Sequence, residues 1–427
     1  MRFSPSFFAA LFFVFFALTL ILRLVLSLRQ SRALRAALGP QARPWPDGRD
    51  EGEREEAVEH ALGKLRLGRF EILARAALTL AFLGVGFNLL GAAAKDLAPG
   101  SAWGQGAALF ALYALVLSLF KGFFSGLSAL GPARRHGFNR AGPGRFFAQW
   151  ALRSALAVLS AFALGAPLSW LALRFADDWA WMAWLLSVWL LLAMRLARTF
   201  LGLPLVRRRI LEDGPLKARV EALLNRAGFE SGGVFVVEAP KRPAHCCAVV
   251  WGMGRAKRVA LFDAWLNQLN ERQIEAMLAL ELGRLRLRHA DRRLAWAIAL
   301  TGAGFGLAFF LSARPGFYFG LGLAYPTVPM ALCALAEISG YFLFPLAPLF
   351  LGVARRHERE VDAYAARLTD PRDLSGALAA ALRANGAPLA GDPLHALFFD
   401  AGPALARRLA DLGQMAVRAE QAKRGAP

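Results

Sequence analysis

Cysteine and acidic residues are scarce in this chain of 427 residues. It has 3 cysteines and no Cys-x-x-Cys pair, which argues against a disulfide framework and fits a reducing compartment. It has 31 acidic residues against 51 Lys and Arg, so its formal net charge is +20. None of the motifs of nucleic-acid-binding proteins is present, and we expect no nucleic-acid partner. In a membrane protein, an excess of this kind belongs to basic cytoplasmic loops.

Apolar residues are abundant, at 56% of the chain, and the mean hydropathy is +0.39. Such values predict a polytopic, mostly α-helical membrane protein with a soluble portion. A membrane-spanning helix needs roughly 20 apolar residues. Seven runs meet this condition, at about 7–28, 71–94, 103–130, 146–174, 179–203, 294–312 and 326–352. No small-residue cleavage site follows the first run, which predicts a retained anchor.

The connections between these runs alternate in charge. Arginines cluster in 29–70, in 131–145 and in 204–293, whereas the connections between them are short and poor in cations. The positive-inside rule then places the N-terminus outside and the soluble part and the C-terminus in the cytoplasm. With Ala-, Arg- and Gly-rich usage, we expect the cytoplasmic (inner) membrane of a bacterium. We divide the chain into a membrane region, 1–203, and a second domain, 204–427, which includes the last two spans.

The second domain reads as α+β. Pro215 opens a predicted helix that ends near Gly228. Short strands are predicted at 234–237, 248–251 and 259–262, between Gly, Pro and basic turns. Further helices are predicted at 354–368, 374–384 and 403–421.

The stretch from Asn270 to Arg293 is predicted as a single helix, in which Asn270 and Gln273 can form a capping box. On its apolar face stands one carboxylate, Glu281. Histidines at 280 and 284 would make it His-Glu-x-x-His, in which two histidines at i and i+4 bind zinc and the Glu is the general base. This chain has Leu280 and Arg284 at those positions.

The order of several short motifs resembles one family. The motifs are His136-Gly137-Phe138-Asn139-Arg140, Gly228-Phe229, Lys257-Arg258, Glu281-Leu282-Gly283, His289, Arg355-x-x-Glu358-x-x-x-Asp362, Asp392-Pro393-Leu394-His395 and Phe398-Phe399-Asp400. Together they resemble the integral-membrane CAAX prenyl endopeptidase family of zinc metallopeptidases, whose catalytic domain is of the gluzincin type. The resemblance implies seven transmembrane helices around an intramembrane chamber and a cytoplasmic α+β gluzincin-type domain.

The resemblance also implies the roles of individual positions. The metal ligands fall on Leu280, Arg284 and Glu358, and the general base falls on Glu281. Glu358 is thus the only retained ligand position. Asp362 would contact a histidine that binds the metal, and His289 would lie near the ligands without binding the metal itself. The substrate-binding strand has Cys247 and Ala248 where the family has Asn-Ala. Gly402 replaces a histidine that is thought to steady the transition state.

A catalytic zinc needs three protein ligands. Leu280 cannot coordinate a metal, and the permanent charge of Arg284 repels one. We therefore expect no cofactor, with zinc bound only if His245, His289 or His357 rebuilt the site. Arg284 is expected to bridge Glu358 and Glu281 in place of zinc; a solvated pair of Arg284 with Glu281 alone is the alternative. Inside the seventh span, Glu337 is expected to face the chamber or a cation such as Arg153.

Three functions follow from this pattern. The first is a pseudopeptidase that binds a protein, peptide or lipid partner without cutting it. The second is an active zinc metalloendopeptidase with a rearranged site. The third is a chamber that holds a lipid or another small molecule. Membrane lipid is an expected partner in each case.

Overall fold

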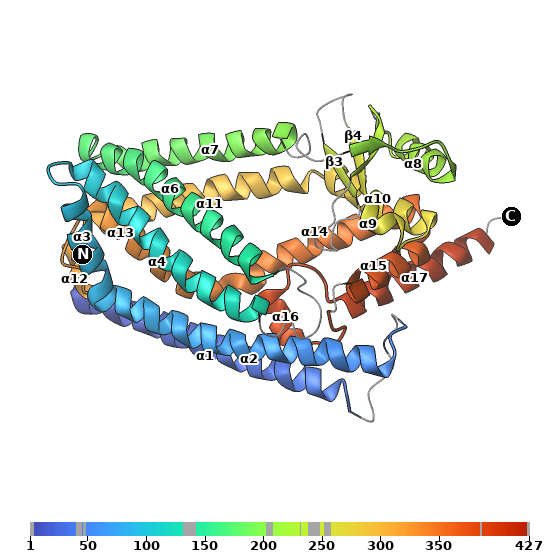
Figure 1. The fold of residues 1–427 in the computed structure, drawn as a ribbon, viewed down its shortest axis with the longest axis horizontal. Helices are drawn as coiled ribbons and strands as arrows, with labels where there is room; N and C mark the ends of the chain where they lie inside the picture. The colour runs from blue at the N-terminus through green and yellow to red at the C-terminus, as the bar shows by residue number, and fades with distance from the viewer. Residues whose placement is uncertain are drawn as a thin grey trace. The chain divides into compact units, whose positions relative to one another are not determined.

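The computed structural model describes residues 4–39, 45, 48–130, 142–201, 208–230, 232–237, 248–251, 258–384 and 387–424. Figure 1 shows the fold, which is dominated by long helices and contains one small sheet. The helices of the seven membrane-length segments are α1 (Pro5–Ala36), α2 (Glu51–Ala81), α3 (Phe87–Leu97), α4 (Ala102–Leu130), α6 (Pro143–Arg174), α7 (Trp179–Leu201), α11 (His289–Ser312), α13 (Val328–Leu343) and α14 (Ala347–Leu368). The other helices are α8 (Pro215–Arg226), α9 (Asp263–Leu266), α10 (Glu271–Arg286), α12 (Pro315–Gly320), α15 (Pro371–Ala384), α16 (Pro393–Phe399) and α17 (Leu405–Arg424). The strands are β1 (Arg208–Ile210), β2 (Val234–Val237), β3 (Ala248–Trp251) and β4 (Arg258–Phe262).

Seven helical segments in the described part of the chain are long and apolar enough to cross a membrane. They coincide with the seven predicted runs, which confirms the fold class. Two of them extend beyond a single helix. A π-helical turn at Phe82–Gly86 joins α2 to α3, and a 3₁₀ turn at Phe344–Leu346 joins α13 to α14. Pro345 lies in the second turn, where a missing N–H is tolerated.

The chain forms two compact units, each built from several segments. The first, called the membrane unit here, comprises 1–31, 60–189 and 297–347. The second, called the sheet unit, comprises 32–59, 190–296 and 348–427. Five long helices continue from one unit into the other, so neither unit is a continuous stretch of sequence.

Aromatic side chains form much of the core of the membrane unit. Phe12, Phe87, Tyr113 and Phe317 are buried there, and several of these rings meet others edge to face. Edge-to-face contacts let large apolar rings pack closely with favourable quadrupole geometry. The helices that carry them are thereby held together by ring packing.

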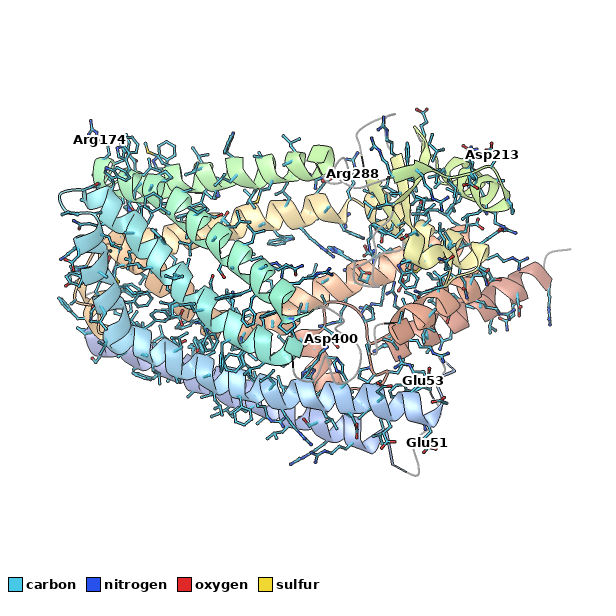
Figure 2. The ribbon with its side chains drawn as sticks, in the orientation of Figure 1. Glu51, Glu53, Arg174, Asp213, Arg288 and Asp400 are labelled. Atoms are coloured by element: carbon cyan, nitrogen blue, oxygen red, sulfur yellow. The ribbon has the colours of Figure 1, made fainter. Side chains whose placement is uncertain are left out.

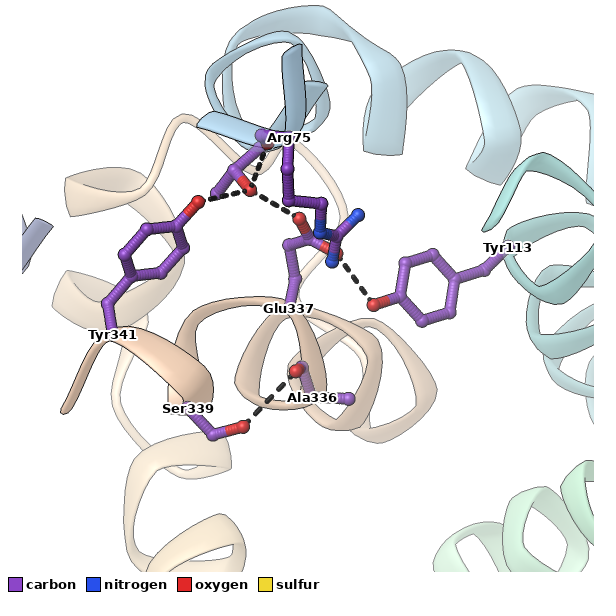
Figure 3. A network of polar contacts seen from close by, with 7 residues as sticks. Arg75, Tyr113, Ala336, Glu337, Ser339 and Tyr341 are labelled. Atoms are coloured by element: carbon purple, nitrogen blue, oxygen red, sulfur yellow. Dashed lines mark hydrogen bonds and ion pairs between the residues drawn. The ribbon is translucent and has the colours of Figure 1, made fainter. Parts of the chain in front are cut away.

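A buried carboxylate lies inside this apolar unit, on α13 (Figure 3). Glu337 accepts hydrogen bonds from Tyr113 OH at 2.7 Å, Arg75 Nη2 at 2.7 Å and Thr79 Oγ1 at 2.6 Å. The cation paired with Glu337 is thus Arg75 on α2, and the sequence-based pairing with Arg153 was wrong, because Arg153 is exposed on α6. A charge removed from water needs such partners.

The sheet has the strand order β1-β2-β4-β3. β2 and β4 are parallel and central, while β1 and β3 run antiparallel at the edges. The predicted strands at 234–237, 248–251 and 259–262 are confirmed to within one residue. β1 was not predicted, because its three residues are all exposed and two of them are arginines.

The predicted single helix from Asn270 to Arg293 is wrong at its C-terminal end. α10 ends at Arg286, and α11 begins at His289. Between them Arg288 has φ 52, in the left-handed region that commonly ends a helix. The chain can therefore change direction where it enters the sixth span.

Candidate functional site

α10 positions the carboxylate at the centre of the site. The predicted capping box is present: Gln273 N donates to Asn270 Oδ1 at 2.9 Å, and Asn270 N donates to Gln273 Oε1 at 3.2 Å. The apolar face of α10 packs into the core of the sheet unit, where Leu280 is only 2% exposed. Glu281 and Arg284 lie at the edge of this buried face, partly open to solvent. The cap and the apolar face together fix where these two side chains emerge.

α14 brings the third residue of the site to α10. Arg284 donates through Nη1 to Glu281 Oε1 and through Nη2 to Glu358 Oε2, the latter at 3.1 Å. The contact that the sequence led us to expect between Arg284 and Glu358 is therefore present. The guanidinium of Arg284 thus lies between two carboxylates, that of Glu281 three positions before it and that of Glu358 74 positions after it.

A glycine sets the separation of the two helices. A Cβ added at Gly283 would lie 2.9 Å from Tyr364 Cδ1 and 3.4 Å from Val361 Cγ1, both on α14. The first distance is shorter than real Cβ contacts, so only glycine fits without a shift. This close approach keeps Glu358 within reach of Arg284.

Burial raises the pKa of the Glu281 carboxyl above its ordinary value. The positive charge and hydrogen bond of Arg284 oppose this rise, while the negative charge of Glu358 adds to it. Glu281 therefore holds a proton more readily than an exposed glutamate does.

Asp362 is held by a different arginine. Arg408 on α17 approaches it with two nitrogens, and its Nε lies 2.7 Å from Asp362 Oδ2. Asp362 is 4% exposed, so this bidentate pair is buried. Asp362 and Arg408 therefore link α14 to α17.

The two nearest histidines contact one another. The rings of His289 and His357 stack with centroids 4.0 Å apart and planes 16° from parallel. His289 Nε2 is 3.5 Å from Glu360 Oε2, but neither ring nitrogen of His289 has a hydrogen-bond partner among the described residues. In stacked rings the nitrogen lone pairs lie in parallel planes and do not converge on one ion.

The remaining predicted positions lie on other elements. Ala248 is buried at the start of the edge strand β3. Gly402 lies between α16 and α17, and a Cβ there would meet nothing within 4 Å. Arg355 on α14 donates to the carbonyls of Leu397 and Asp400 at 3.2 and 2.9 Å, which anchors the end of α16. Cys247 and the loop around His136 lie outside the described residues.

The residues present do not fit a catalytic zinc. Leu280 offers no donor atom, and Arg284 brings a permanent positive charge to the point between the two carboxylates. No group of three His, Cys, Asp or Glu side chains in the described ranges is arranged to hold a metal ion. What these side chains can do chemically is hold two helices together through a shared cation.

Sequence reasoning missed the role of Arg408. A signal was available, because Leu405, Leu409 and Leu412 mark the apolar face of its helix and Arg408 shares that face. A cation on a buried face needs an acidic partner, but the partner lies 46 positions away, beyond any local pattern.

Two family models match consecutive parts of the chain. The model described as "CAAX prenyl protease N-terminal, five membrane helices" matches residues 47–208, and "Peptidase family M48" matches residues 211–416.

Curated relatives and a solved structure agree with these models. "CAAX prenyl protease 1" of Saccharomyces cerevisiae is 30% identical over 273 residues, which are 59% of this chain and 60% of the yeast protein. The Arabidopsis thaliana homolog is 27% identical over 281 residues, 64% and 65% of the two chains. Each match thus spans less than two thirds of the relative. The crystal structure of S. mikatae Ste24p has a TM-score of 0.79 at 21% identity and covers 95% of this chain and 99% of that one, which shows a shared fold.

Proposed function

The chain belongs to the CAAX prenyl protease family of M48 peptidases and is a multi-pass integral membrane protein, and from this membership we propose that it is a pseudopeptidase. In this proposal it binds a protein, peptide or lipid partner and does not cut it. The observation that carries the proposal is the guanidinium of Arg284 between Glu281 and Glu358. Because Leu280 and Arg284 cannot hold a metal, Glu281 would have no metal-bound water to activate as a general base.

The loss extends beyond the two ligand positions. Gly402 offers no hydrogen-bonding side chain where the family has a histidine. Asp362 is ion-paired with Arg408. The scaffold that would hold a site is retained, since α10, α14 and the edge strand β3 are all present. A retained scaffold with lost chemistry favours binding over cleavage.

The proposal includes a location. The Ala-, Arg- and Gly-rich composition favours a bacterium. The arginine-rich connections favour an orientation with the N-terminus outside and the sheet unit inside the cell. A partner of this kind would be presented from the membrane or the cytoplasm.

The metal content of the full-length protein tests the proposal. We expect wild type, purified in detergent without chelator and dialysed against zinc, to retain almost no zinc by mass spectrometry, because two of the three ligands are absent. Leu280→His/Arg284→His is expected to bind about one zinc. Glu358→Ala in that double variant removes the last ligand and is expected to abolish binding again.

The matched control is Leu280→His alone, which restores one ligand and leaves the cation, and it should remain without zinc.

A prenylated CAAX peptide, the substrate class in the relatives' name, provides the second readout. We expect the fluorescence anisotropy of the labelled peptide to rise and saturate with wild type while the peptide stays intact. Cleavage by wild type that Glu281→Gln abolishes, or near-stoichiometric zinc lost in Glu358→Ala, would show an active enzyme with a rearranged site.

A further inference from the structure

A groove lined mainly by polar side chains lies between α4 and α6 in the membrane unit, whereas Glu281, Arg284 and Glu358 belong to the sheet unit. Its volume is ≈ 240 Å³. Two cations, Lys121 and Arg153, line it together with the polar side chains of Ser125 and Gln149. We propose that this groove binds the phosphate group of an anionic membrane lipid.

Two glycines of α4 and two aromatic residues of α6 build the groove. A Cβ added at Gly122 would lie 1.9 Å from Trp150 Nε1, and one at Gly126 would lie 3.3 Å from Phe146 Cε1. Trp150 Nε1 also donates to the carbonyl of Ser118 at 3.2 Å. The glycines and the aromatic residues are each four positions apart, so one turn of each helix packs against one turn of the other. The groove therefore has a fixed shape.

The groove carries an uncompensated positive charge. No acidic side chain lines it, and neither Lys121 nor Arg153 forms an ion pair with any residue that the structure describes. Both cations are exposed to the surroundings of the unit. Leu119 and Leu152 are exposed on the same two helices, as expected of helices that face lipid. Two cations in such a place need an anion or water.

The depth of the two cations suits the phosphate level of a leaflet. At 1.5 Å per residue, Lys121 lies roughly 13 Å from the end of α4, and Arg153 lies about 15 Å from the start of α6. If each helix is centred on a hydrocarbon core of about 30 Å, both Cα atoms fall about 6 Å inside the same boundary. Long cationic side chains reach the headgroups from there. Lys supplies a point charge and Arg a two-pronged donor, both of which bind phosphate.

The headgroup bound to the full-length protein tests the proposal. Purified protein is placed in nanodiscs with equal amounts of phosphatidylglycerol and phosphatidylcholine, released into the mass spectrometer, and the retained lipids are counted. We expect wild type to retain phosphatidylglycerol preferentially. Lys121→Gln/Arg153→Gln should bind it about 30-fold more weakly, because each basic residue near the surface contributes roughly a fivefold effect.

The matched control is Arg174→Gln, which removes an exposed cation from the other end of α6 (Figure 2). It should retain phosphatidylglycerol like wild type, and all three proteins should have similar melting temperatures. Equal retention by wild type and the double variant would overturn the proposal. If ~10 mM inorganic phosphate raised the melting temperature of wild type while wild type showed no lipid preference, the groove would bind a free anion. That result would overturn the lipid assignment.

Discussion

At the scale of single residues, Arg284 supplies one positive charge at a position where the resemblance to the family predicts a zinc ligand. The guanidinium contacts Glu281 and Glu358, so these three side chains carry a net charge of −1 when both carboxyls are ionised. Burial of that residual charge is unfavourable. The raised pKa of Glu281 reflects this cost, since protonation of one carboxyl removes the excess charge.

Glu281→Gln should therefore change stability in a pH-dependent way. A carboxyl whose pKa is raised on folding stabilises the fold fully below its unfolded pKa of 4.5, and this contribution is lost as pH rises through the folded value. The melting temperature of Glu281→Gln minus that of wild type should thus be more positive at pH 8 than at pH 4.5. Asp213→Asn is the control, because its lowered pKa keeps Asp213 ionised over this range and its difference should stay flat. A flat difference for Glu281→Gln would contradict the assignment.

Some residue contacts could be predicted from the sequence and others could not. Arg284 was predictable as the partner of Glu358 only because a helical spacing and a family pattern placed both residues at one site. The pairs Asp362–Arg408 and Glu337–Arg75 depend on helices that are distant in sequence. Local periodicity shows that such charges are buried but does not identify their partners.

At the scale of elements, the packing of α10 against α14 depends on Gly283. Gly283→Ala should lower the melting temperature, although alanine is the better helix former by about 1 kcal/mol. The added Cβ would meet the ring of Tyr364 at 2.9 Å, and overpacking of this kind costs about 1–3 kcal/mol. The shift should also weaken the contact between Arg284 and Glu358.

A second glycine provides the control for this prediction. A Cβ at Gly352 on α14 would meet only Arg355 Nη2 at 3.8 Å, so Gly352→Ala should leave the melting temperature unchanged or raise it. Tyr364→Ala should relieve the clash, so that the double variant Gly283→Ala/Tyr364→Ala loses less than the sum of the single variants. Additive losses would show that the clash is not the cause.

Element boundaries were predictable where a local signal marks them. The capping box at Asn270, Pro215 and Gly228 each mark a boundary that the structure has. The boundary at Arg288 has no such signal, because an arginine in the left-handed conformation is set by where the chain must go next and not by its own preference. β1 was missed for a similar reason, since pairing with β2 and not its own pattern makes it a strand.

At the scale of the whole molecule, hydropathy identified all seven spans because a bilayer demands length and apolarity from each helix alone. The two compact units could not be read from the sequence in this way. Their segments alternate along the chain, and five helices continue from one into the other. The predicted boundary at residue 203 divides the sequence into two continuous parts, and it stays a prediction.

The orientation of the spans gives the last prediction. Because arginines concentrate in alternate connections, a cysteine introduced at Asp177 should face the outside of the cell, whereas one at Glu420 should face the cytoplasm. In a background with Cys246, Cys247 and Cys333 replaced by alanine, a membrane-impermeant maleimide should label the first on intact bacterial cells and the second only after the membrane is opened. Asp177 is exposed and the side chain of Glu420 is 45% exposed, so the side of the membrane and not burial decides the result. Labelling of Glu420→Cys on intact cells would invert the orientation and place the sheet unit, with Arg284, outside the cytoplasm.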